Sequence, residues 1–174
     1  VAKMLDLGYP GGPKVEDAAG AGNPLRFPLP RPLFGDGTCD LSLSGLKTAV
    51  LRALQSLPSS PTRQDIADLC ASFQLAVTDV LKHKTETALE RYLARWKEGA
   101  LVIAGGVAAN KSVRATLENV AHKHGLRFAV APAALCTDNA AMIAWAGVER
   151  LKLGWSDALD AAPKARWPLD LGGA

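Results

Sequence analysis

The stretch Leu101-Val-Ile-Ala-Gly-Gly-Val-Ala-Ala-Asn110 decides the fold, because it joins an apolar segment to a helix through a glycine pair. The apolar start predicts a buried strand, and residues 111–124 repeat apolar side chains at helical spacing. Gly105 and Gly106 carry no Cβ, so backbone N–H groups in this turn could approach a phosphate or a ribose. Asn110 adds an amide that can both donate and accept. The same pattern also occurs where glycines serve only packing, so a ligand is one of two interpretations.

A second strand, loop and helix follow directly. Residues 127–131 predict a strand, and residues 139–153 predict an alanine-rich helix. Two such neighbouring units bring their loops together at the carboxyl ends of the strands, where open α/β sheets bind ligands. Asp138, in the second loop, could cap the helix, or Thr137 could cap it and leave the carboxylate free for a metal or Mg-phosphate. A catalytic metal needs about three protein ligands, so the others would come from outside this chain or from the nucleotide.

Composition limits the class of protein. The chain has 174 residues and a net charge of +3, which fits one domain or one lobe and is not a pronounced nucleic-acid signature. No signal peptide or membrane-length apolar run is visible, so a cytoplasmic protein is expected. The three cysteines lack metal-finger spacing. Cys70 is expected in the core, and Cys136 is a weak candidate for a reactive thiol.

The remaining segments give local predictions. Residues 1–7 predict the last turns of a helix, and the proline- and glycine-rich residues 8–13 predict a loop, either plain or a pocket wall with Tyr9 as a stacking surface. Residues 14–38 are interpreted as irregular chain. Five apolar side chains in that segment are expected to be buried: Leu25, Phe27, Leu29, Leu33 and Phe34.

Further along, residues 39–44 alternate and predict a strand, after which Ser44 caps a helix over residues 46–57. Thr62 to Asp65 resembles a capping box. The apolar stripe from Ile66 to Tyr92 then predicts one long helix, or two with a kink near residues 82–85. Trp167, near the end of the chain, is expected to dock on the body of the domain.

Six motifs in order carry a family resemblance. The set closely resembles the C-terminal lobe of the TsaD family, which makes threonylcarbamoyladenosine in tRNA and bears the older name O-sialoglycoprotein endopeptidase or glycoprotease. The motifs are Leu7-Gly-Tyr-Pro-Gly-Gly-Pro13, Phe27-Pro-Leu-Pro-Arg-Pro32, Leu41-Ser-Leu-Ser-Gly-Leu-Lys-Thr48, Ala104-Gly-Gly-Val-Ala-Ala-Asn110, Cys136-Thr-Asp-Asn139 and Arg166-Trp-Pro168.

The resemblance implies a fold and an activity. It implies an α/β fold, one lobe of the actin/Hsp70/sugar-kinase (ribonuclease H-like) type, with a mixed sheet and flanking helices. It implies transfer of a threonylcarbamoyl group from its adenylate to adenosine 37 of tRNAs that read codons beginning with A. Gly105, Gly106 and Asn110 match substrate-binding positions, and threonylcarbamoyl adenylate, ATP or ADP would be the ligand. Asp138 matches a ligand of one divalent metal ion, iron or zinc. The implied partners are tRNA, a lobe-like paralogue and an ATPase subunit, with no membrane.

The main departure concerns the other lobe. In the family, two histidines of an HxxxH motif in an N-terminal lobe complete the metal site, and that lobe has no counterpart in residues 1–174. The chain is therefore expected to be a C-terminal lobe that alone binds metal poorly and transfers nothing. No catalytic nucleophile is implied, because the tRNA amine attacks directly. Two rival interpretations are a metalloendopeptidase, as the older name says, and a non-catalytic paralogue that binds nucleotide or docks a partner.

Overall fold

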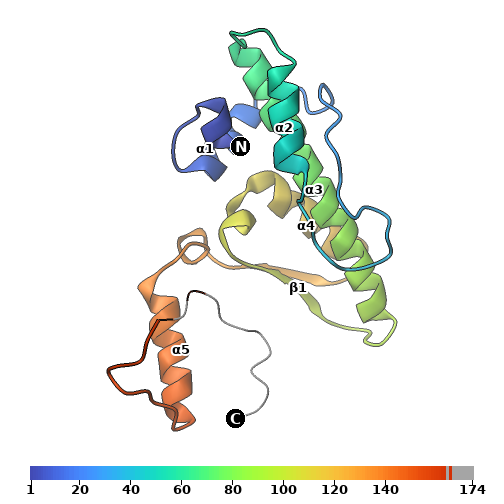
Figure 1. The fold of residues 1–174 in the computed structure, drawn as a ribbon. Coiled ribbons are helices and arrows are strands. Elements are labelled where there is room, and N and C mark those ends of the chain that lie inside the picture. Colours follow the sequence, from blue (N-terminus) through green and yellow to red (C-terminus); the bar gives the residue numbers. More distant parts are fainter. Residues whose placement is uncertain (164, 166–174) are drawn as a thin grey trace. The chain divides into compact units, whose positions relative to one another are not determined.

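A computed structural model describes residues 1–163 and 165 of the chain. They divide into two compact units, Val1–Thr137 and a second unit from Asp138 onward. The first unit holds 3₁₀ helices η1 (Ala2–Leu5), η2 (Gly106–Ala109) and η3 (Ala133–Leu135), helices α1 (Gly11–Ala19), α2 (Leu46–Gln55), α3 (Arg63–Leu93) and α4 (Lys111–Lys123), and strands β1 (Ala100–Ile103) and β2 (Arg127–Val130) (Figure 1). The second unit contains α5 (Ala140–Lys152).

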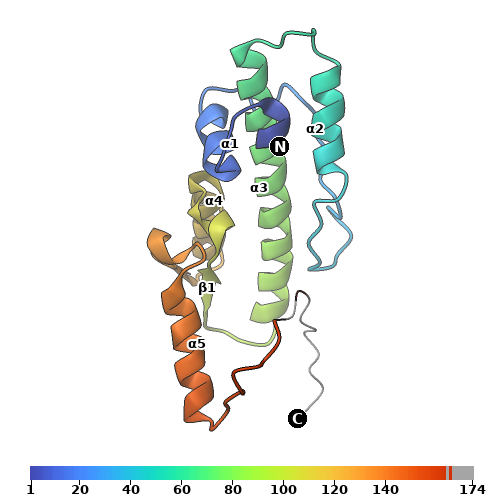
Figure 2. The ribbon, with the colours of Figure 1, turned by 60° about the vertical axis from the view of Figure 1, so that its left-hand side comes forward.

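Helix α3 is the axis of the first unit. It begins with the predicted capping box, in which the Thr62 hydroxyl accepts from the Asp65 amide and the Asp65 carboxylate accepts from the Thr62 amide. It then continues to Leu93 as one helix, so the version with a kink is wrong. Helices α1 and α2 lie on different sides of α3 (Figure 2). Leu69 and Cys70 are fully buried against α1 and η1, whereas Leu46 and Val50 of α2 pack near Ala76.

The sheet consists of β1 and β2, which run parallel and are joined by α4. Ala100 pairs with Arg127 and Ile103 pairs with Val130. The predicted apolar face of α4 is buried over the sheet and the end of α3, as expected for a parallel strand pair with a crossover helix. The strand–turn–helix order predicted for residues 101–124 is therefore confirmed. The expected burial of the strand is wrong: Leu101 and Ile103 are only half-buried, and Val102 on the other face of the sheet is 67% exposed. The fold is mixed α/β, with a small parallel sheet and flanking helices.

One loop prediction is wrong at the start of the chain. Residues 8–13 were expected to exclude helix, yet α1 begins at Gly11 and carries Pro13 in its first turn. Proline is tolerated there, because the first N–H groups of a helix have no partner within it. Val15 and Ala19, four residues apart, then bury against α3. Residues 1–7 form only a short 3₁₀ helix rather than the end of an α-helix.

The chain just after α1 passes close to the backbone of α3 at Gly22. Gly22 contacts the backbone of Ala67, and a Cβ at position 22 would lie 2.0 Å from the Ala67 carbonyl oxygen. Of the five apolar side chains expected to be buried in residues 14–38, Leu29 is buried and Phe27 is partly buried. The other three are largely exposed: Leu25, Leu33 and Phe34.

The strand predicted over residues 39–44 is also wrong. No strand forms there, and Leu41 and Leu43 are exposed, so the alternation has no core to face. The Ser42 hydroxyl accepts from the Ser44 amide, a local bond that competes with strand pairing. Ser44 does not cap α2, because the N-cap is Gly45 at a φ of 79°. The helix itself is confirmed.

In the second unit, Asn139 caps α5 through its side chain, which accepts from the Met142 amide at 3.0 Å. Gly154, at a φ of 76°, ends the helix as predicted. The Arg150 guanidinium lies 5.3 Å from the Trp155 ring centroid. The predicted docking of Trp167 lies outside the described residues. No described helix has both the length and the apolar character that a bilayer crossing needs.

Candidate functional site

The loop that leaves β1 is shaped by Gly105. Its φ of 81° is a left-handed conformation that favours glycine, and a Cβ at this position would meet nothing within 4 Å. Gly106 has ordinary backbone angles and also borders open space. The fold therefore demands glycine at position 105, whereas the openness at both positions leaves the backbone accessible from outside. That is the geometry that sequence reasoning assigned to the approach of a phosphate or a ribose.

Asn110 joins this loop to two helices. Its Oδ1 accepts from the Val113 amide at 3.0 Å and caps α4, and its Nδ2 donates to the Gln74 Oε1 of α3 at 2.9 Å. An amide offers two N–H donors and two lone pairs, so one of each remains for a ligand. Asn110 is thus both a structural cap and a half-buried polar group beside the glycine loop.

Glu16 is a residue that sequence reasoning missed. Its Oε1 accepts from the Lys111 amide at 2.7 Å, which places an α1 carboxylate on the first N–H of α4. Helix N-termini favour negative charge, because their first N–H groups are unpaired and their dipole is positive at that end. The two residues are 95 positions apart, and no local pattern links them. The start of α4 therefore gathers α1, α3 and the β1 loop around a point that already holds an anion.

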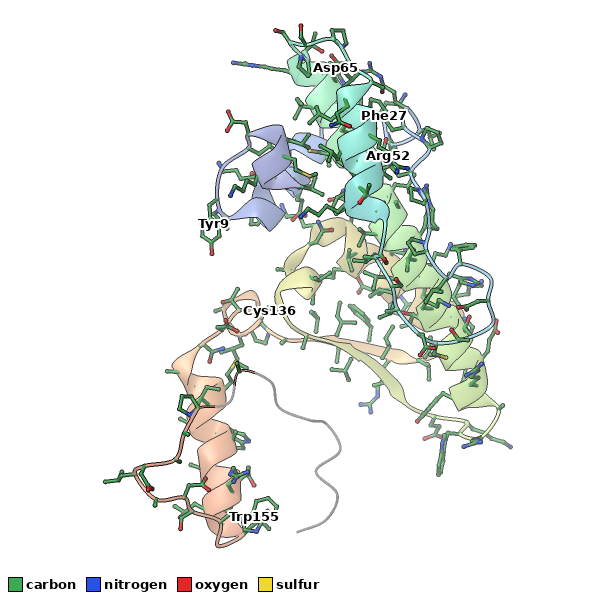
Figure 3. The ribbon with its side chains drawn as sticks, viewed as in Figure 1. Tyr9, Phe27, Arg52, Asp65, Cys136 and Trp155 are labelled. Atoms are coloured by element: carbon green, nitrogen blue, oxygen red, sulfur yellow. The ribbon has the colours of Figure 1, made fainter. Side chains whose placement is uncertain are left out.

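Tyr9 lies on the loop between η1 and α1, and its side chain is 94% exposed. Figure 3 shows its ring projecting away from the helices. Both sequence interpretations of this loop, a plain connection and a wall with a stacking surface, are compatible with that position.

Cys136 closes the loop that follows β2. Its thiol is buried and donates to the Ala131 carbonyl at 3.3 Å, so the side chain holds the loop against the end of the strand (Figure 3). Cys70 is fully buried in α3, and desolvation by burial raises the pKa of its thiol to about 11. Raised pKa values make thiols poor nucleophiles, which agrees with the predicted core role of Cys70.

Asp138 is the first residue of the second unit. Because Asn139 is the N-cap of α5, neither of the two caps considered from the sequence, Asp138 or Thr137, takes that position. The Asp138 carboxylate is exposed and forms no hydrogen bond or ion pair with any described residue, so it can bind a cation. Within residues 1–163 and 165, no three His, Cys, Asp or Glu side chains come together as a metal site. Asp138 can therefore offer a single carboxylate to a cation, and the described residues do not complete a metal site around it.

A separate charged cluster stabilises the fold. Arg26 contacts Asp65 at 2.5 Å and Asp68 at 2.8 Å, and both carboxylates are buried on α3. The hydrogen bond from Arg26 is the largest cause that lowers the pKa of Asp68, and the hydrogen bond from the Thr62 hydroxyl is the largest that lowers the pKa of Asp65. The Asp68 carboxylate also accepts from the Asn23 amide and from the Gln64 side chain, so the cluster anchors the segment before Phe27 to α3.

Known proteins that are similar to this chain include a family of tRNA-modifying enzymes. The family model TsaD, tRNA N6-adenosine threonylcarbamoyltransferase, matches residues 1–145. Curated proteins of that name are similar to this chain: 59% identity over 172 residues in Rhodospirillum rubrum, 57% over 173 in Rhizobium meliloti and 54% over 174 in Agrobacterium fabrum. These alignments cover 98%, 97% and 97% of this chain but 48%, 48% and 47% of the relatives. The chain spans about half the length of the curated relatives it matches, and it belongs to the TsaD family.

Proposed function

We propose that this chain is the C-terminal lobe of a tRNA threonylcarbamoyltransferase. The whole enzyme moves the threonylcarbamoyl group from its adenylate to the exocyclic amine of adenosine 37, in tRNAs that read codons beginning with A. The observation that carries the proposal is the loop before α4, where the open Gly105–Gly106 backbone meets Asn110, whose amide keeps one donor and one lone pair unused. Family membership and the names of the relatives support the same reaction.

The chain's own residues bind and orient the adenylate. Backbone N–H groups at Gly105 and Gly106 approach the ribose or phosphate, and the remaining N–H and lone pair of Asn110 fix the nucleotide against the loop. ATP or ADP would occupy the same place. Holding the adenylate still next to the tRNA amine makes the attack effectively intramolecular, so no protein nucleophile is required.

Asp138 supplies one ligand of a divalent metal, iron or zinc. Its free, exposed carboxylate fits that role, and two histidines of an N-terminal lobe would complete the site. Held there, the ion would supply Lewis-acid chemistry to the carbonyl and phosphate oxygens of the adenylate.

The proposal extends to the architecture and partners of the whole protein. The lobe would be of the actin/Hsp70/sugar-kinase type, with the adenylate in the crevice between the two lobes of the whole protein. The whole protein would act in the cytoplasm. The partners would be tRNA, a lobe-like paralogue and an ATPase subunit. A metalloendopeptidase is disfavoured, because the matched family and relatives are transferases by name. A platform paralogue is disfavoured because it has no use for a free carboxylate at Asp138.

A chimera tests the proposal. The matching half of the Rhodospirillum rubrum relative is replaced by this chain, which is possible because the alignment covers 98% of it. Purified chimera receives threonylcarbamoyl adenylate and unmodified tRNA, and modified adenosine is measured by mass spectrometry. We expect activity within about tenfold of the parent, and a loss of at least about a hundredfold in the Asp138→Asn variant. Asp157→Asn, in the same unit and 70% exposed, is the matched control and should stay active. A folded but inactive chimera, or an Asp138→Asn variant as active as its control, would contradict the proposal.

A further inference from the structure

The turn between α3 and β1 exposes aromatic rings among cations. Trp96 is 61% exposed and Tyr92 is 40% exposed. Arg95 and Lys97 flank Trp96 in sequence and are also exposed. Arg127, the first residue of β2, pairs with Ala100 at the end of the same turn. We call the set Tyr92, Arg95, Trp96, Lys97 and Arg127 the α3–β1 patch.

The backbone of this patch is fixed. The Tyr92 hydroxyl donates to the Glu98 carbonyl at 2.8 Å, and the Trp96 amide donates to the Tyr92 carbonyl at 2.9 Å. A Cβ at Gly99 would lie 2.6 Å from the Tyr92 hydroxyl, so the turn closes tightly over that ring. Since the Arg127 amide also donates to the Gly99 carbonyl at 3.4 Å, the two basic segments are held next to each other. A partner would therefore meet a preorganised surface.

The cations of the patch carry unneutralised charge. Arg95, Lys97 and Arg127 make no ion pair with any described residue. The carboxylates close to them in sequence are those of Glu90 and Glu98, so cations remain in excess. Other cations of the unit vary in this respect: Arg26, Arg31 and Lys84 each bind an aspartate, whereas Lys47 and Arg52 on α2 also make no ion pair with a described residue.

We propose that the α3–β1 patch binds the RNA chain of the tRNA substrate, an inference that rests on the proposed function. Free cations neutralise phosphates, and exposed aromatic rings stack on bases without regard to sequence. The excess of positive charge favours a polyanion over a protein surface of ordinary composition. Trp96 takes a base, and Arg95, Lys97 and Arg127 take neighbouring phosphates.

The position of the patch suits a substrate that also reaches the glycine loop. The patch lies at the amino ends of β1 and β2, and the loop lies at their carboxyl ends. Asn110 of the loop binds Gln74, whereas the patch begins where α3 ends at Leu93, so a rise of about 1.5 Å per residue separates the two places by about 28 Å, on the order of eight nucleotides of a helical strand. One arm of a tRNA is therefore long enough to contact both places.

The test measures tRNA binding by this chain. Fluorescein-labelled tRNA transcript is titrated and followed by anisotropy at several salt concentrations. The Arg95→Ala/Lys97→Ala pair should weaken binding about tenfold and flatten the dependence of log K on log salt by about 1.4 to 1.8, the value for two phosphates. Trp96→Ala should weaken binding at least about fivefold, and Trp96→Phe should restore most of it.

The control is the Lys47→Ala/Arg52→Ala pair on α2, two exposed cations with equal charge, which should change binding less than about twofold. Circular dichroism confirms that each variant is folded. The inference is overturned if this pair weakens binding as much as the patch pair, if patch variants bind like the parent, or if the parent chain binds no tRNA. Patch variants that bind normally would instead fit a protein partner. The chimera's transfer activity decides the proposed function separately, so the two can fail independently.

Discussion

Replacing Asn110 by alanine removes both contacts that fix the start of α4. The lost cap bond to Val113 costs about 1 kcal/mol, in the middle of the range for such caps. The lost hydrogen bond to Gln74 costs about 0.5 to 1 kcal/mol, because the half-buried Gln74 amide can turn partly to water. The two sum to about 1.5 to 2 kcal/mol. With a urea slope of about 2 kcal/mol/M, the unfolding midpoint should fall by about 0.8 to 1 M.

Two further variants separate the contacts. Gln74→Ala keeps the cap, so its midpoint should fall by at most half as much. Asn110→Asp keeps an acceptor for Val113, and the Gln74 amide can rotate to donate to it, so stability should stay within about 0.5 kcal/mol of the parent. Unfolding is followed by far-UV circular dichroism in urea. A midpoint for Asn110→Ala equal to that of the parent, or equal loss in Asn110→Asp, would refute this reasoning. A chimera that keeps stability but loses transfer in Asn110→Asp would assign the loss to ligand binding.

Three other predictions follow from packing and charge. Gly22→Ala forces a Cβ to within 2.0 Å of the Ala67 carbonyl, which no side-chain rotation relieves, so unfolding should become easier by about 2 kcal/mol or more, measured in urea. The ion pair with Lys84 lowers the pKa of Asp36 from 3.8 to about 2, so its stabilisation should be complete above pH 4 and disappear as pH falls towards 2. Asp36→Asn should therefore differ from the parent in urea midpoint at pH 6 and match it near pH 2, and a constant difference would contradict the assignment. Cys70 should resist thiol reagents at pH 8 until the chain unfolds, and rapid labelling of native protein, located by peptide mapping, would show that it is not sealed.

The sequence predicted elements whose signals are local and periodic. The apolar face of α4 and the capping box at Thr62 each confine their evidence to a few neighbouring residues, and both are confirmed. The strand prediction for residues 39–44 was wrong because an alternating sequence alone does not supply a partner strand. The loop prediction for residues 8–13 was wrong because Gly11 and Pro13, which disrupt a helix interior, are tolerated in the first turn of a helix.

The sequence predicted those residues of the candidate site that lie within one loop, but not their partners from distant helices. Gly105 and Asn110 stand out in sequence because a strand ends and a helix begins there. Their partners do not, since Gln74 and Glu16 come from distant helices through contacts that only packing creates. The second loop shows a different limit. Thr137, Asp138 and Asn139 are all good caps, so composition could not choose among them, and the structure selects Asn139.

The uninterrupted run of α3 has a mechanical consequence. Its 31 residues form a strut of about 46 Å, with Gln74 partway along and Trp96 just beyond its far end. No break interrupts the hydrogen-bonded backbone of the helix between Gln74 and its end at Leu93. A displacement of the end of α3 where RNA is proposed to bind would therefore also move Gln74, which accepts the hydrogen bond from Asn110.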